Sequence, residues 1–259
     1  MSTPMLQAEG VNKRFGAVVA AADLNIRIGA GERVSLIGSN GAGKTTFVNM
    51  ITGYLKPDSG RILLDGADIT ALHPRAVTQL GVARSFQIPQ LFGQLSVTDN
   101  MLVANACHDR RLSFFQPARR REAQQRAEAL LERFGLAEHR QRRVSELPGG
   151  VRKLLDIAMA LTTAPKLLLL DEPTSGVSAD EKFPMMDTIM QALGEARGTT
   201  VLFVEHDWTS WNATPTAWWR FTAAASLPTT RPRWRWPPMT YAVTSPANCS
   251  RKPEEAHHA

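Results

Sequence analysis

Short, continuous runs of apolar residues alternate with longer stretches of helical periodicity along most of the chain. Three of these runs are Glu32–Gly38, Lys166–Asp171 and Thr199–Glu205. Runs that are apolar at almost every position are typical of strands buried on both faces of a largely parallel sheet. Since such strands alternate here with helices, the pattern predicts an α/β fold in which helices cover the sheet.

The stretch from about Val97 to Arg143 has a different pattern, because it is helical and rich in arginine. It predicts an inserted helical sub-domain, which we place at about residues 95–163. The arginines between Arg110 and Arg143 either form a solvated helix face, which is the more common arrangement, or contact membrane subunits or anionic lipid headgroups.

Charge and cysteine content narrow the function classes. The chain has 259 residues, of which 43% are hydrophobic, and a formal net charge of +6. Residues 208–259 hold 6 Lys/Arg against 2 Asp/Glu, so most of the positive excess lies there, and a nucleic-acid partner is not expected. Cys107 and Cys249 are far apart in the sequence, which offers neither a disulfide framework nor metal-ligand spacing.

Membrane-spanning and secretory segments are not predicted. No window approaches the roughly 18 apolar residues that a membrane span requires. The first residues, Met1–Glu9, lack the charged and then apolar pattern of a secretory signal. Any association with a membrane is therefore expected to be peripheral.

A glycine-rich loop follows the first apolar run, where Gly38, Gly43, Lys44 and Thr45 satisfy the spacing G-x-x-x-x-G-K-[ST]. Glycines let backbone N–H groups point at a phosphate, and the helix that begins near Thr46 adds partial positive charge. Lys44 is predicted to contact the β- and γ-phosphate oxygens, and the Thr45 hydroxyl to bind Mg²⁺. The loop alone predicts a P-loop NTPase and leaves kinases, GTPases and motors open. Its predicted nucleotide-binding residues are Gly38, Ser39, Asn40, Gly41, Ala42, Gly43, Lys44, Thr45 and Thr46.

Polar residues at the ends of other apolar runs are candidates for hydrolysis. Asp171 and Glu172 follow an apolar strand, at the end where ligands gather in open α/β sheets. Asp171 is suited to hold Mg²⁺ through water, and Glu172 to polarise the attacking water. Gln87 can offer its amide oxygen to Mg²⁺ or to this water, and His206 can donate to the γ-phosphate. Each is weak evidence alone, since Asp-Glu-Pro can be an ordinary turn and a single histidine is more often structural.

The order and spacing of these motifs resemble the ABC ATPase family over about residues 5–207. The matching motifs are the adenine-stacking aromatic Phe15, the Q-loop Gln87, the signature Leu147–Val151, the Walker B pair Asp171 and Glu172, the D-loop Ser178–Asp180 and the switch histidine His206. The resemblance implies an ABC ATPase core of the P-loop NTPase class with N-terminal antiparallel β elements. It also implies that ATP and Mg²⁺ are the cofactors.

The signature departs from the family pattern Leu-Ser-Gly-Gly-Gln at two positions, Pro148 and Val151. In a head-to-tail dimer of the family, this segment completes the ATP site of the partner, where the serine hydroxyl bonds the γ-phosphate. Pro148 has neither a hydroxyl nor an N–H, but proline is tolerated at a helix start, and Gly149 and Gly150 still offer N–H groups to the nucleotide. We hypothesise that the site formed by this signature and the partner's phosphate loop is the weaker of two.

Three stretches, Gly81–Gln87, Leu91–Asn100 and Asp171–Ser178, resemble ATPases of branched-chain and hydrophobic amino acid uptake. This implies an importer at the cytoplasmic face of the bacterial inner membrane. Its implied partners are permease subunits, a second ATPase subunit and, indirectly, a solute-binding protein. Relatives that serve urea or amide uptake, or lipopolysaccharide export, remain alternatives. Non-transport relatives of the DNA-repair or ribosome-associated kind are disfavoured, because no long coiled-coil insertion, zinc module or second ATPase domain is present.

The composition changes near residue 208, since all six tryptophans and seven of the sixteen prolines fall in residues 208–259. Back-translation with a one-base shift permits M-D-I-V-E-R-Y-A-D-R-V-V-A-F-Y, which resembles the helix and strand with which the family continues. We therefore interpret residues 208–259 as an atypical, possibly frame-shifted and poorly ordered tail, separate from the ATPase domain at 1–207. The corresponding alternative function is a product that binds nucleotide but is uncoupled from transport.

Overall fold

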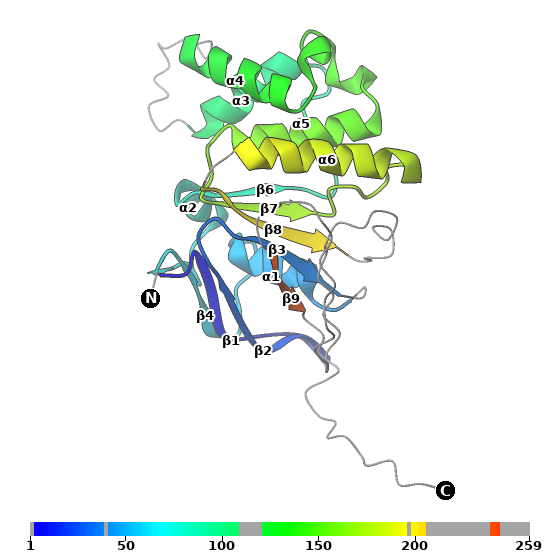
Figure 1. Ribbon diagram of the computed structural model, residues 1–259. Coiled ribbons are helices and arrows are strands. Elements are labelled where there is room, and N and C mark those ends of the chain that lie inside the picture. Colours follow the sequence, from blue (N-terminus) through cyan, green and yellow to red (C-terminus); the bar gives the residue numbers. More distant parts are fainter. Residues whose placement is uncertain (1–2, 39–40, 109–120, 196–197, 206–238, 244–259) are drawn as a thin grey trace, which may run out of the picture.

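The structure, a computed structural model, describes residues 3–38, 41–108, 121–195, 198–205 and 239–243. These residues form an antiparallel sheet, a parallel sheet and a set of helices, arranged in layers (Figure 1). The predicted α/β class, with a parallel sheet and antiparallel N-terminal strands, is confirmed.

The antiparallel sheet has the strand order β2-β1-β4-β5. Its strands are β1 (Leu6–Phe15), β2 (Val18–Ile28), β4 (Ser59–Leu64) and β5 (Ala67–Asp68). A tight turn at Gly16 joins β1 to β2, and φ of this glycine is +57°. The turn pairs Phe15 with Val18 and leaves the Phe15 ring at the end of the sheet, 48% exposed.

The parallel sheet has the order β6-β7-β8-β3-β9. Its strands are β3 (Arg33–Ile37), β6 (Val82–Ser85), β7 (Leu167–Asp171), β8 (Thr200–Glu205) and β9 (Met239–Val243). All four pairings are parallel, so the carboxyl ends of the strands lie at one edge. The three apolar runs singled out in the sequence form β3, β7 and β8.

Strand β9 lies within the C-terminal tail. Met239–Val243 pairs with β3 in parallel register, from Arg33 opposite Met239 to Ile37 opposite Val243. The interpretation of residues 208–259 as a separate, poorly ordered tail stays a prediction. The low sequence periodicity concealed this edge strand, because five residues are too few to establish a period. The other residues of the tail lie outside the described ones.

The helices cover both faces of the parallel sheet (Figure 1). They are α1 (Lys44–Ile51), α2 (Pro74–Gln79), α3 (Val97–His108), α4 (Arg121–Arg133), α5 (Gly149–Leu161) and α6 (Ala179–Glu195), with short 3-10 helices η1 (Ala137–His139) and η2 (Val144–Glu146). Helix α1 lies between the two sheets, while α3 to α6 gather on the opposite side of the parallel sheet. None of the described helices is long and apolar enough to cross a bilayer.

Two hydrophobic cores lie on the two faces of the parallel sheet. Alternate residues of β7 divide between them, because successive side chains of a strand point to opposite faces. Leu168 and Leu170 pack with the helices of the sub-domain, whereas Leu167 and Leu169 pack toward α1 and the antiparallel sheet. Burial on both sides explains why this run is apolar at every position and fixes the strand that ends at Asp171.

Candidate functional site

The phosphate loop joins β3 to α1, and its glycines meet a steric requirement of the fold. Gly43 precedes α1 with φ of +86°, a left-handed conformation that residues with a Cβ rarely adopt. A Cβ at this position would lie 2.0 Å from the carbonyl oxygen of Ala20 on β2. Gly41 also has a positive φ, of +78°. Ser39 and Asn40 lie outside the described residues.

Lys44 is the first residue of α1 and is only 4% exposed. Its Nζ donates to the carbonyl oxygen of Gly38 over 2.5 Å, which folds the side chain back across the loop. Burial lowers the pKa of Lys44, while the charges of Glu172, Asp171 and Glu205 act in the opposite direction. A buried ammonium beside carboxylates and exposed loop N–H groups is suited to an anionic ligand.

Asp171 ends β7 and forms a buried ion pair with a residue of the neighbouring strand. Its Oδ2 accepts from Nη2 of Arg84 over 2.6 Å, and the exposed fractions of the two side chains are 6% and 10%. Nη1 of Arg84 donates to the side-chain oxygen of Asn49 on α1 over 2.7 Å. The guanidinium thus links the helix of the phosphate loop, β6 and β7.

Glu172 follows Asp171 in a left-handed backbone conformation, with φ of +48°, and is 6% exposed. Its N–H donates to the carbonyl oxygen of Val204 over 2.9 Å. Its Oε2 accepts from Nε2 of Gln87 over 2.9 Å. Two predicted catalytic residues that are 85 positions apart in the sequence are therefore in direct contact. The structure brings them together because β6 and β7 are neighbours in the sheet.

Glu205, the last residue of β8, adds a third carboxyl group at this edge. Burial, followed by the charge of Glu172, raises the pKa of Glu205 to about 8. Its Oε1 is buried and has no hydrogen-bond partner among the described residues. His206, the predicted switch histidine, is the next residue and lies outside the described ones.

The signature segment begins α5, as the sequence indicated. Pro148 is its N-cap, with φ of −56° and ψ of 154°, and its carbonyl oxygen accepts from the N–H of Arg152 over 3.1 Å. A proline is compatible with this position, because the first N–H groups of a helix have no partner within the helix. In the described part of the chain, a Cβ on Gly149 or Gly150 would meet no heavy atom within 4 Å outside its own helix.

The remaining predicted groups lie on separate elements. Phe15 is exposed at the end of β1, and Nζ of Lys13 lies 5.6 Å from its ring centroid. Thr45 and Thr46 lie in the first turn of α1. Thr45, Gln87 and Asp171 provide hydroxyl, amide and carboxylate oxygens, the donor atoms that Mg²⁺ prefers. Among the described residues, no group of three or more His, Cys, Asp or Glu could hold a metal.

Four residues at this edge have no role in the motifs found in the sequence, namely Arg84, Lys153, Asp156 and Glu205. Nζ of Lys153 donates to the carbonyl oxygen of Glu172 over 2.9 Å, and Asp156 accepts from Ser85 over 2.7 Å. Lys153 and Asp156 lie on α5, whereas their partners Glu172 and Ser85 lie on other elements. Arg84 and its partner Asp171 are 87 positions apart in the sequence. Spacing along a sequence cannot reveal such pairs, although a charged residue within an apolar run, as at Arg84, is a usable signal.

Comparison with known proteins gives a consistent assignment. The family model described as ABC transporter matches residues 21–175. The chain is 39% identical over 216 residues to the high-affinity branched-chain amino acid transport ATP-binding protein LivG of Escherichia coli, covering 80% of this chain and 84% of that protein. It is 37% identical over 214 residues to BraF of Pseudomonas aeruginosa, with the same coverage.

Solved structures give the same result. The ADP conformation of MJ1267, an ATP-binding cassette of an ABC transporter, is similar with a TM-score of 0.68 and 33% identity, covering 79% of this chain and 82% of that one. The dimeric cassette MJ0796 bound to ADP and Pi is similar with a TM-score of 0.67 and 26% identity, covering 80% and 90%. The chain therefore belongs to the ABC transporter family, as an ATP-binding subunit in which ATP hydrolysis energises transport.

Proposed function

We propose that this chain energises the import of branched-chain or other hydrophobic amino acids by hydrolysing MgATP at the carboxyl edge of its parallel sheet. The names of its relatives LivG and BraF support the substrate class. The observation that carries the catalytic assignment is the contact of Gln87 with Glu172, 2.9 Å between Nε2 and Oε2, next to the buried Lys44.

The nucleotide is bound by the phosphate loop in this proposal. The loop from Gly38 to Thr46 surrounds the β- and γ-phosphates with N–H groups, and Lys44 donates to their oxygens. Phe15 stacks on the adenine. The oxygens of Thr45, Gln87 and Asp171 hold Mg²⁺, which when bound neutralises charge that develops on the phosphates.

Glu172 is the base in this proposal. It orients a water whose oxygen bonds to the γ-phosphorus as the bond from that phosphorus to the ADP oxygen breaks, and it accepts the proton of the water. Gln87 holds the carboxylate in place, and His206 donates to the γ-phosphate. Burial of Glu172 excludes competing hydrogen bonds from bulk solvent, which strengthens the interaction with this water.

A second ATPase subunit completes each site in this proposal. At the N-terminus of α5, a Cβ on Gly149 or Gly150 would meet no heavy atom of the described residues within 4 Å outside the helix, so a nucleotide held by another subunit can approach the backbone closely. The dimeric state of the relative MJ0796, bound to ADP and Pi, supports this arrangement.

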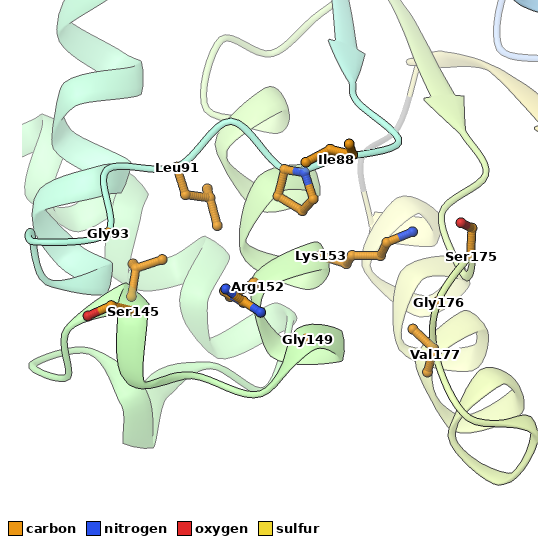
Figure 2. Close-up of a pocket in the computed structure, with 12 residues that line it drawn as sticks. Ile88, Leu91, Gly93, Ser145, Gly149, Arg152, Lys153, Ser175, Gly176 and Val177 are labelled. Atoms are coloured by element: carbon orange, nitrogen blue, oxygen red, sulfur yellow. The ribbon is translucent and has the colours of Figure 1, made fainter.

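We place the contact with a transmembrane permease subunit on the segment after Gln87. Ile88 and Phe92 in this segment are 74% and 52% exposed. Ile88 lines a cavity of about 400 Å³ between this segment, α5 and the residues Ser175–Val177 (Figure 2). Apolar side chains exposed beside a hollow are typical of an interaction site, and a contact here would reach Gln87 through the backbone. Such docking places the chain peripherally at the cytoplasmic face of the inner membrane.

Replacement of Glu172 by Gln tests the catalytic assignment. We expect steady-state ATP hydrolysis to fall about a thousandfold, because the general base is lost, while ATP remains bound and stabilises a dimer. Hydrolysis is measured by phosphate release and dimer formation by size-exclusion chromatography with MgATP. Normal turnover by this variant would show that another group activates the water.

The transported solute is tested with the complete transporter. The chain is co-purified with the products of neighbouring genes, and ATP hydrolysis is assayed with candidate solutes and the solute-binding protein. Stimulation by leucine, isoleucine or valine is expected, whereas stimulation only by urea or short amides, or by lipopolysaccharide, would identify one of the alternative transporters.

A nucleotide-binding but uncoupled product is the second candidate function. The relatives cover four-fifths of this chain, and the fifth that remains equals the share of residues 208–259. ATP binding without hydrolysis, not restored by partner subunits, would favour this candidate. An uninterrupted reading frame in independent isolates of the gene would exclude a frame shift as its cause.

A further inference from the structure

The backbone of Glu172 is held from three directions. Its N–H donates to Val204 on β8 over 2.9 Å, and its carbonyl oxygen accepts from the N–H of Ser175 over 3.0 Å. The same carbonyl oxygen also accepts from Nζ of Lys153 on α5 over 2.9 Å. The first two bonds belong to the sheet and to the turn that follows it. The third is the one that comes from the helix of the signature.

The hydrogen bond from Lys153 acts on a strained part of the backbone. Glu172 has φ of +48°, and residues with a Cβ adopt this region only where the surroundings enforce it. The peptide that Lys153 contacts is the one that follows this strained Cα, so the contact helps to fix the backbone conformation from which the Glu172 side chain projects. That side chain is in turn the hydrogen-bond acceptor of Gln87.

The Lys153 ammonium lies among acidic side chains. Burial lowers the pKa of Lys153, and the charges of Glu205, Glu172, Asp156 and Asp171 oppose this effect. Figure 2 shows the side chain extending from α5 toward the segment of Ser175, across the cavity between them. A cation in this place both donates to the Glu172 carbonyl and faces the carboxylates.

The same helix holds the Q-loop. Asp156, one turn after Lys153 and therefore on the same face of α5, accepts from Oγ of Ser85 over 2.7 Å and from the N–H of Phe86 over 3.1 Å. Its other carboxylate oxygen accepts from the N–H of Gln90 over 3.4 Å. Helix α5 thus contacts the segments on both sides of the bond between Gln87 and Glu172.

We propose that Lys153 is a positioning residue for Glu172, and that through it the signature helix sets the orientation of the hydrolytic carboxylate in its own chain. This inference rests on the proposed role of Glu172 as the base. The signature of one chain contacts the nucleotide of the other in that function. Movement of α5 therefore connects occupancy of one site to the alignment of the base in the second site.

Replacement of Lys153 by Met tests the proposal in the full-length chain with its transporter partners. We expect kcat for ATP hydrolysis to fall between about tenfold and a hundredfold, since small misplacements of catalytic groups have effects of this size. KM for ATP should change less than about twofold. Replacement by Arg, which keeps the charge and a donor, should restore most of kcat. Unchanged kcat with Met, or equal loss with Met and Arg, would overturn the proposal.

Retention of ATP separates positioning from nucleotide binding. In a Glu172→Gln background, adding Lys153→Met should leave the ATP-bound dimer as abundant as in Glu172→Gln alone. Loss of that dimer would overturn the proposal, because Lys153 would then act in binding. Lys166→Met, which removes an exposed ion pair with Asp65, is the matched control and should leave kcat unchanged.

Two further outcomes are distinguishable. If Lys153→Met does not fold, Lys153→Ala, which also removes the donor and the charge, provides the same comparison of kcat with KM. If the unmodified transporter hydrolyses no ATP, the proposed function fails. If it hydrolyses ATP and Lys153→Met retains the full kcat, the positioning role alone fails.

Discussion

The two glycine-rich helix starts of this chain differ in what requires their glycines. At α1, Gly43 has φ of +86° and an added Cβ would meet the Ala20 carbonyl oxygen at 2.0 Å. At α5, Gly149 and Gly150 have no positive φ, and an added Cβ would meet no atom within 4 Å outside the helix in the described part of the chain. Among the described residues, the packing of the fold requires the first glycine but not the other two.

This difference separates the roles of the two helix starts. The phosphate loop is completed within the chain, because Lys44, Gly38 and β2 supply its contacts. In the proposed function, Gly149 and Gly150 of the signature contact a nucleotide that another subunit holds. The carboxyl groups of Asp171, Glu172 and Glu205 face both Lys44 and Lys153. The four experiments below test this contrast.

Lys44→Ala should have the largest effect. We expect ATP affinity to fall about a hundredfold, since loss of a hydrogen bond between charged groups costs up to about 3 kcal/mol. The affinity is measured by titration calorimetry. Lys166→Ala, at an exposed position, is the control. Equal affinity of the Lys44 variant and the parent would mean that phosphate binding does not occur at this loop.

Gly43→Ala and Gly150→Ala compare the two helix starts directly. Gly43→Ala should reduce the free energy of unfolding by about 3 kcal/mol, because the Cβ meets backbone and the left-handed φ is strained. Gly150→Ala should change this free energy by less than about 0.5 kcal/mol but weaken the ATP-dependent dimer. Denaturant unfolding and size-exclusion chromatography measure the two effects. Equal destabilisation by both variants would remove the contrast.

Glu205→Gln tests the protonation state of the buried Glu205 carboxyl group. The pKa of Glu205 is raised to about 8, from 4.5, so the folded chain holds a proton that the unfolded chain releases between these values. Its contribution to stability is therefore present at low pH and is lost as pH rises through this window. From pH 5 to 8, the stability of the parent should fall by about 3 kcal/mol relative to the Gln variant.

Urea unfolding of both proteins at several pH values measures this difference. Glu172, Lys153, Lys182 and Asp171 also face Glu205, and all four are present in both the parent and the variant. A difference between parent and variant that does not depend on pH would show that Glu205 is ionised throughout.

Mixed dimers give the smallest expected effect and test the signature. If the partner is a different subunit with a serine signature, Lys44→Ala in this chain should inactivate the stronger site, and the equivalent change in the partner should spare it. We expect the two mixed dimers to differ about tenfold in ATP hydrolysis, since one phosphate donor is missing at the site that Pro148 completes. Equal loss from either change would rule the asymmetry out.

The sequence located the parts of the site that are consecutive in the chain. The phosphate loop, the Asp171–Glu172 pair and the start of α5 at Gly149 were all predicted from local patterns, since a strand, a turn and a helix start each have local composition rules. The parallel sheet followed from runs that are apolar at almost every position. The short β9 was not predicted, because five residues next to the tryptophan-rich stretch have no distinct period.

The tertiary structure decided the contacts between elements. Gln87 meets Glu172, Arg84 pairs with Asp171, and Lys153 reaches the Glu172 carbonyl, in each case across strands or helices that the sequence does not order relative to one another. The sequence by itself determined which residues could carry the chemistry, because phosphate binding and strand burial depend on local residue types. Only the tertiary structure decided how Glu172 is aimed, because its orientation depends on the strand order β6-β7-β8 and on the packing of α5 against that edge.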